Sequence, residues 1–359
     1  LDLLRESVSH FTPEYAATRC EVSPDDIRTA AKIFAGGPKG TAGSGTGPNM
    51  APHGTLMESL TLTLNVLCGR VLKAGDTLES PYMLSPGDTR RAQVIAPSNP
   101  TPGAPHRVRD LHGLADEMLT NALNDEILLE GDGQVRALIV SGGNPVQAWP
   151  DQQKTLEALQ SLELLIVIDH RMTATAELAD YIFAPRLQLE REDVPNVMDR
   201  RFPAVYTNYT DRVIDSGDDV LNEWEVFVGL AKRLGTQIAL SGGDLPIETA
   251  LTDGDVIDYV YGNSRLPMSE WRESRGVIHD NPIIVLPGEP NNGAKFAVCP
   301  QDVYLELQEV RDEESGSDLL GNFNDSEFPF LLVGRRLKHA LNSLGSELPG
   351  LARVATTNY

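Results

Sequence analysis

Between residues 135 and 185, short apolar runs alternate with amphipathic stretches of helical spacing. The apolar runs cover residues 135–140, 164–168 and 181–184, and the helical stretches cover 151–160 and 173–179. The runs are apolar throughout, which is typical of strands in a parallel sheet that is covered on both faces. We therefore predict an α/β fold with a doubly wound, mostly parallel, Rossmann-like sheet in which these strands are neighbours.

Four further stretches, at residues 12–35, 52–69, 111–129 and 218–234, have the hydrophobic spacing of amphipathic helices. In the first, Ser23 followed by Pro24 predicts a helix start. We expect the acidic side chains of the third stretch to face solvent. In the first and fourth stretches, the positions that we expect to be buried are Ile27, Ala30, Ala31, Phe34, Trp224, Phe227, Leu230 and Leu234.

The pattern also suggests a division into domains. Residues 1–35 form a helical lead-in that we expect to continue from an upstream domain, and residues 36–325 form the α/β domain. A polar, acidic stretch at 312–317 precedes a new apolar run that begins at Phe328. This change in composition predicts that residues 326–359 begin another domain.

Composition narrows the choice of partners. The 359 residues include 30 basic and 52 acidic side chains, a net charge of −22, which argues against binding to nucleic acid or to anionic membranes. No apolar run reaches the roughly 20 residues of a membrane-spanning helix. The three cysteines lack the C-x-x-C spacing of metal sites, so we expect buried thiols and no metal ligand in this chain.

A glycine-rich segment covers residues 36–50, directly before the second predicted helix. So many glycines favour close approach of the backbone to a ligand, and the alternative is a flexible linker. A glycine turn that leads into a helix is one way in which α/β proteins bind phosphate. The segment has neither a Gly-Lys-Ser/Thr sequence nor the spacing G-x-G-x-x-G, so by itself it does not identify the ligand.

Two loops follow the predicted strands at their carboxyl ends, where parallel sheets bind ligands. They are Ser141–Pro145 and Asp169–Thr173. An acidic residue after the second strand of a nucleotide-binding unit commonly accepts hydrogen bonds from a ribose or a base. Asp169 is at that position, and the alternative is that it caps the following helical turn.

Four motifs, taken in order, resemble those of the molybdopterin oxidoreductase family, which includes dimethyl sulfoxide reductase and formate dehydrogenases. The resemblance extends over residues 12–359. The motifs are Gly45-Thr46-Gly47-Pro48-Asn49-Met50, Gly142-Gly143-Asn144-Pro145, Asp169 with Thr173-Ala174-Thr175-Ala176, and Gly334-Arg335-Arg336.

The resemblance implies a catalytic subunit that performs two-electron oxidation or reduction of a small substrate. Its cofactor would be bis-molybdopterin guanine dinucleotide with molybdenum or tungsten. Asp169 and Thr173 correspond to the pair that binds a guanine. The loop beside the ribose and pyrophosphate corresponds to Gly142, Gly143 and Asn144, and the glycine turn near the pterin corresponds to Gly45, Gly47 and Asn49.

The resemblance also implies parts that this chain lacks. We expect a 4Fe-4S cluster and the protein ligand to the metal in an upstream domain, so no catalytic residue is assigned here. Residues 326–359 would be the truncated start of a C-terminal β-barrel domain. We expect the 359 residues to be catalytically silent alone and the protein to be cytoplasmic. Electron-transfer subunits are possible partners.

Two other interpretations stay open from the sequence. One is a structural relative without the cofactor, such as the large iron–sulfur subunit of respiratory complex I, although Asp169 with Thr173 favours the enzyme. The other is an independent Rossmann-type protein that binds a nicotinamide, which the missing G-x-G-x-x-G argues against.

Overall fold

The computed structural model describes residues 1–20, 22–47, 50–78, 83–84, 89–96, 105–109, 111–113, 117–195, 206, 208–274, 282–313 and 350. The chain divides into two compact units. The first unit combines Leu1–Val71 with Phe296–Tyr359, and the second unit is Leu72–Lys295. The predicted domain that begins at residue 326 lies outside the described residues, apart from Gly350.

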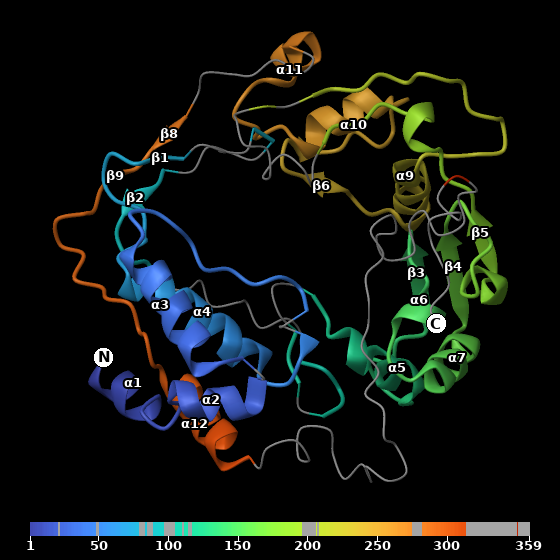
Figure 1. The fold of residues 1–359 in the computed structure, drawn as a ribbon. Coiled ribbons are helices and arrows are strands. Elements are labelled where there is room, and N and C mark those ends of the chain that lie inside the picture. The colour runs from blue at the N-terminus through green and yellow to red at the C-terminus, as the bar shows by residue number, and fades with distance from the viewer. Residues whose placement is uncertain are drawn as a thin grey trace. The chain divides into compact units, whose positions relative to one another are not determined.

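Helices form the described part of the first unit. They are α1 (Asp2–Ser7), α2 (Pro13–Cys20), α3 (Pro24–Gly36), α4 (Gly54–Leu67) and α12 (Gln301–Asp312). Helix α12 contacts α1 and α4, far from it in sequence (Figure 1). The buried side chains at this contact are Leu56, Val303 and Leu307.

The single helix predicted over residues 12–35 is two helices. Helix α3 starts as predicted, because the Ser23 side chain accepts a hydrogen bond from the Asp26 N–H and Pro24 occupies the first turn. The prediction that its apolar positions are buried is wrong, since α3 has no buried residue. Ala30 and Ala31 are exposed, and Ile27 and Phe34 are half-buried.

A parallel sheet forms the centre of the second unit. Among the described residues its order is β3 (Ala137–Ser141), β4 (Leu164–Ile168) and β5 (Tyr181–Phe183), with β4 in the middle (Figure 1). Val140 is opposite Val167, and Val167 is opposite Ile182. The three strands predicted from the apolar runs, their adjacency and their parallel direction are therefore confirmed.

One face of this sheet is covered by α6 (Pro145–Ala148), α7 (Gln152–Ser161) and the 3₁₀ turn η2 (Ala176–Leu178). Val140, Leu165 and Val167 pack there against Val146 and Leu159. On the opposite face Ile139 and Tyr181 are 41% and 61% exposed. The second helical layer of a doubly wound sheet therefore stays a prediction.

Helix α5 (Thr120–Leu128) is shorter than the predicted 111–129 and packs on α7. The prediction of a solvated acidic face is wrong for Glu126, which is 2% exposed. Its carboxylate accepts a hydrogen bond from the Arg107 N–H at 2.6 Å and lies 3.3 Å from the buried His106 imidazole. Burial of a carboxylate requires such partners, and here they come from the loop before the helix.

Helix α9 (Glu223–Leu234) ends at Gly235, which has a left-handed φ of +64°. Its buried residues are Val226, Val228 and Ala231. The predicted buried face is wrong for Phe227, which is 41% exposed, and for Leu234, which is 72% exposed. Trp224 and Leu230 are half-buried, and Trp224 packs on the buried cluster that includes Val228.

The other described elements of the second unit include α10 (Asp253–Val260), α11 (Met268–Ser274) and the 3₁₀ turn η3 (Gln188–Glu190). The remaining described strands are short and form two-stranded sheets. Strand β1 (Thr77–Leu78) pairs with β8 (Ile283–Ile284), β2 (Arg91–Ala92) pairs with β9 (Leu286–Pro287), and β6 (Ala239–Leu240) pairs with β7 (Gly243–Asp244). No helix in the described ranges is long and apolar enough to cross a membrane.

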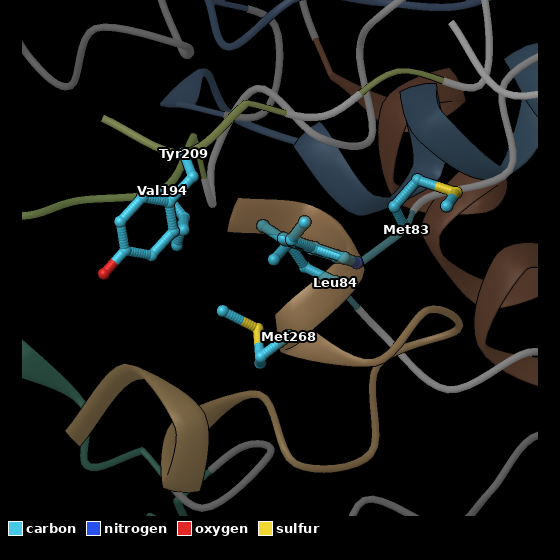
Figure 2. Packing of buried hydrophobic residues seen from close by; sticks show 6 residues of the cluster. Met83, Leu84, Val194, Tyr209 and Met268 are labelled. Atoms are coloured by element: carbon cyan, nitrogen blue, oxygen red, sulfur yellow. The ribbon is translucent and has the colours of Figure 1, made fainter. Parts of the chain in front are cut away.

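Figure 2 shows a core cluster that joins α11 to distant loops of the second unit. The fully buried Trp271 packs there with Met83, Met268 and Tyr209. Burial, and the hydrogen bond that the Tyr209 hydroxyl makes with Glu192, raise the pKa of Tyr209 to about 12. The raised pKa keeps the proton on the Tyr209 hydroxyl, which donates it in the hydrogen bond to Glu192.

Candidate functional site

The loop after β3 begins with a glycine that the backbone requires. Gly142 has a φ of +61°, a conformation that residues with a side chain rarely adopt. Its N–H donates to the Ile168 carbonyl at 2.9 Å, which extends the pairing with β4. Among the described residues, apart from the two chain neighbours of Gly142, no atom lies within 4 Å of the position that a Cβ would take, so these residues leave this side of the loop open.

Asn144 connects the loop after β3 to the loop after β4. Its Oδ1 accepts hydrogen bonds from the Thr175 hydroxyl at 2.8 Å and from the Thr175 N–H at 3.3 Å. The same hydroxyl accepts a bond from the Val146 N–H at 3.1 Å. Thr175 is fully buried, so these bonds are shielded from water. The structure thus brings the predicted residues 142–144 together with the loop that contains Asp169 and Thr173.

Asp169 follows β4 directly, and its side chain is 8% exposed. Its Oδ1 accepts a hydrogen bond from the Arg171 N–H at 3.0 Å and lies 3.5 Å from Nδ1 of His170. This bond closes a local turn and does not cap η2. The other carboxylate oxygen has no hydrogen-bond partner among the described residues.

The sequence left open whether Asp169 caps the helical turn that follows it. In the structure Thr173 caps that turn. Its Oγ1 accepts a hydrogen bond from the Ala176 N–H at 3.1 Å. Because the oxygen acts as an acceptor here, the hydroxyl hydrogen is available to donate elsewhere. Asp169 and Thr173 together offer one acceptor and one donor at the carboxyl end of β4.

The glycine-rich segment belongs to the first unit and lies along α4. The Ala42 N–H donates to Oδ1 of Asn65 at 2.7 Å, and Nδ2 of Asn65 donates to the Ala42 carbonyl at 2.8 Å. Ser44 donates to Glu58 on the same helix. A flexible linker would not have such regularly spaced contacts with one helix, so the structure favours an ordered segment.

Arg70 fixes the start of the same segment. Its guanidinium donates to the carbonyls of Phe34 and Gly37 and lies over the Phe34 ring at 3.9 Å. Gly40 has a φ of +155°, and a Cβ there would be 3.0 Å from the guanidinium. In the described part of the chain, and apart from chain neighbours, no atom lies within 4 Å of a Cβ built on Gly45 or Gly47.

The remaining predicted site residue, Asn49, lies outside the described residues. Gly45 and Gly47 are part of the first unit, whereas Gly142, Asn144 and Asp169 are part of the second.

Sequence reasoning missed Thr175, the buried residue that joins the two loops. The only available signal was its place in the Thr173-Ala174-Thr175-Ala176 motif, where either threonine could have been the functional one. Glu190, in the stretch after that motif, accepts a hydrogen bond from the Leu187 N–H at 2.7 Å. It therefore stabilises a local turn.

The described residues contain no group of three or more side chains suited to hold a metal ion. The three cysteines are free thiols. The expectation that all are buried is wrong, since Cys20 is exposed and Cys68 and Cys299 are half-buried.

The amino-acid sequence is similar to sequences of known proteins. Residues 42–233 match the family description "Molybdopterin oxidoreductase". The chain is 26% identical to the F420-dependent formate dehydrogenase subunit alpha of Methanocaldococcus jannaschii over 239 residues, which cover 65% of this chain and 34% of that protein. It is 24% identical to the dimethyl sulfoxide/trimethylamine N-oxide reductase of Cereibacter sphaeroides over 284 residues, which cover 74% of this chain and 34% of that protein. The chain thus spans about a third of the length of these curated relatives.

Among solved structures, the acetylene hydratase from Pelobacter acetylenicus has a similar fold. The TM-score is 0.58 at 19% sequence identity, over 78% of this chain and 40% of the other. At this identity the likeness concerns the fold.

Proposed function

Because this chain belongs to the molybdopterin oxidoreductase family, we propose that it binds the guanine dinucleotide tail of a bis-pterin molybdenum or tungsten cofactor within a catalytic subunit. The protein would oxidise or reduce a small substrate by two electrons, together with electron-transfer subunits, in the cytoplasm. The relatives that are named as formate dehydrogenase and dimethyl sulfoxide reductase support this class of reaction.

The side chains at the carboxyl ends of β3 and β4 suit a guanine nucleotide. Guanine carries an N–H and an amino group side by side, and a carboxylate accepts from both. Asp169 has one oxygen without a partner among the described residues, and the Thr173 hydroxyl can donate to the guanine carbonyl. The open side of Gly142 leaves room for a ligand next to the backbone.

In this proposal the residues of the chain bind and orient, and they carry out no bond-breaking step. When bound, the metal with its pterin dithiolenes supplies the redox chemistry. Asp169 and Thr173 would recognise the base. Gly142, Gly143 and Asn144 would bind the ribose and pyrophosphate. Gly45, Gly47 and Asn49 of the glycine-rich segment would lie against the pterin. The carboxylate of Asp169 is the observation that carries the proposal, because it is nearly buried and one of its oxygens accepts no hydrogen bond from the described residues, so that this oxygen can accept from a ligand.

Titration of the chain with GDP and with ADP, by isothermal calorimetry, tests the proposal. We expect GDP to bind more tightly, since adenine lacks the two adjacent donors that Asp169 needs. The variant Asp169→Asn keeps an oxygen for the Arg171 N–H but replaces half of the guanine acceptor. It should weaken GDP binding by about tenfold or more.

The exposed Asp218 provides the matched control, because Asp218→Asn makes the same change in charge elsewhere in the second unit. It should leave GDP affinity unchanged. Equal binding of GDP and ADP, or an unaffected Asp169→Asn variant, would contradict a guanine site. Absence of any nucleotide binding would favour the structural relative without the cofactor.

A further inference from the structure

We propose that Thr175 is a positioning residue, which fixes the side-chain amide of Asn144 so that its NH₂ group is presented to the bound nucleotide. The inference rests on the proposed function and adds to it which partner is the donor in one hydrogen bond with the nucleotide. Asn144 would donate a hydrogen bond to a phosphoryl or ribose oxygen and could not accept one from the ligand.

The orientation of the Asn144 amide follows from its neighbours. A backbone N–H can only donate, so the Asn144 atom 3.3 Å from the Thr175 nitrogen has to be the oxygen. The Thr175 hydroxyl is compatible with this orientation, because its oxygen accepts from the Val146 N–H while its hydrogen is donated to Asn144 Oδ1, 2.8 Å away. The reversed amide would place NH₂ against the Thr175 N–H, which cannot accept.

The amide nitrogen of Asn144 is consequently the end of the side chain that is not bonded to Thr175. One of its hydrogens is donated to Oε1 of Gln147 at 2.9 Å. The other has no partner among the described residues. Asn144 is half-buried and follows Gly143 in the loop that the nucleotide would occupy. This hydrogen can therefore be donated to water or, when the nucleotide is bound, to an oxygen of the ligand.

Thr175 can impose this orientation because it is completely buried and bonded on both sides. Its backbone N–H and its hydroxyl both donate to the same oxygen, so a rotated amide would turn its NH₂ group toward the Thr175 N–H, which cannot accept, in a low-dielectric site.

Two substitutions separate positioning from mere stabilisation. In Asn144→Asp, one carboxylate oxygen can accept both bonds from Thr175, while the other presents an acceptor where the ligand requires a donor. We expect this variant to fold and to bind GDP about tenfold or more weakly. Thr175→Val removes the hydroxyl at almost constant volume and should also weaken GDP binding, whereas Thr175→Ser should restore it.

Calorimetric titrations with GDP and with guanosine, alongside thermal unfolding, give the result. A loss seen with GDP alone identifies a phosphoryl oxygen as the acceptor, and an equal loss with both identifies a ribose oxygen. Thr249→Val, which removes a hydroxyl at the surface of the same unit, should change neither affinity. If the unchanged chain binds GDP and Asn144→Asp binds it equally well, the inference is overturned and the proposed function stands. If the unchanged chain binds no GDP, both fall.

Discussion

Gly142 and Gly143 are adjacent, but only Gly142 has a backbone conformation that favours glycine. Gly142 has a left-handed φ of +61°, whereas Gly143 is outside that region and a Cβ there would be at an ordinary 3.5 Å from Val140. We expect Gly142→Ala to lower the free energy of unfolding by about 1 kcal/mol through backbone strain alone. Gly143→Ala, the matched control, should change it by less. Urea denaturation of both variants measures the difference, and equal effects would contradict it.

The residues of the site were predictable to different degrees. Asp169 was a candidate because an acidic residue after a buried strand commonly binds a ribose or a base, although the pattern left helix capping as an alternative, and its role in binding stays a prediction. Thr175 was not, because nothing in a linear pattern says which of two nearby threonines turns inward and becomes fully buried. Cys20 was wrongly expected to be buried, since the general tendency of thiols says nothing about a short helix with no buried residue.

At the scale of elements, α4 orders the glycine segment through Asn65, whose amide bonds to both backbone groups of Ala42. We expect Asn65→Leu to remove this pairing and to speed hydrogen exchange of the Ala42 amide by about fivefold, since one hydrogen bond contributes about 1 kcal/mol. Mass spectrometry of peptides from residues 36–47 measures the change.

Peptides that contain β4, in the other unit, are the internal control for this exchange experiment and should keep their protection. An unchanged rate at Ala42 would show that the segment is ordered by Arg70 and Glu58 without Asn65. A general rise in exchange would point to unfolding of the chain.

The strands were predicted more accurately than the helices. A fully apolar run between two turns has few structural alternatives, and β3, β4 and β5 lie within two residues of the predicted bounds. The buried face of α9 was assigned from periodicity alone. In the structure Leu245 and Ile247 pack on Val228 and Ala231, so tertiary partners decide which side of the helix is covered.

At the scale of the whole molecule, the first unit is built from segments on either side of the second in sequence. Hydrophobic periodicity identifies an amphipathic helix but says nothing about its partner. The packing of α12 on α1 and α4 was therefore not predictable, and the division into domains at residues 35 and 325 stays a prediction.

His53 links these distant segments by electrostatics. Its Nδ1 lies 2.9 Å from a Glu306 oxygen and its Nε2 lies 2.6 Å from a Glu313 oxygen. Arg19 of α2 pairs with the same Glu313 at 3.2 Å. The hydrogen bond with Glu313 is the main cause that raises the pKa of His53, and the bond with Glu306 adds to it, against an opposing effect of burial.

The protonated imidazole can donate to both carboxylates, whereas the neutral form can donate to only one and turns a lone pair toward the other. Because the pKa of His53 is raised on folding above its ordinary 6.5, the stabilisation is fully present below that value and is lost as pH rises through the higher folded value. We expect the free energy of unfolding to fall as pH rises above the ordinary imidazole pKa of 6.5, and the His53→Gln variant to show a smaller fall. Urea denaturation at a series of pH values measures how steeply the free energy of unfolding falls with pH in the unchanged chain and in the variant.

His10→Gln is the matched control. It removes an imidazole of the same unit that contacts only aromatic rings among the interactions described, so it should keep the slope of the unchanged chain. If His53→Gln kept that slope as well, the ion pairs of His53 would not contribute to holding α12 against α4.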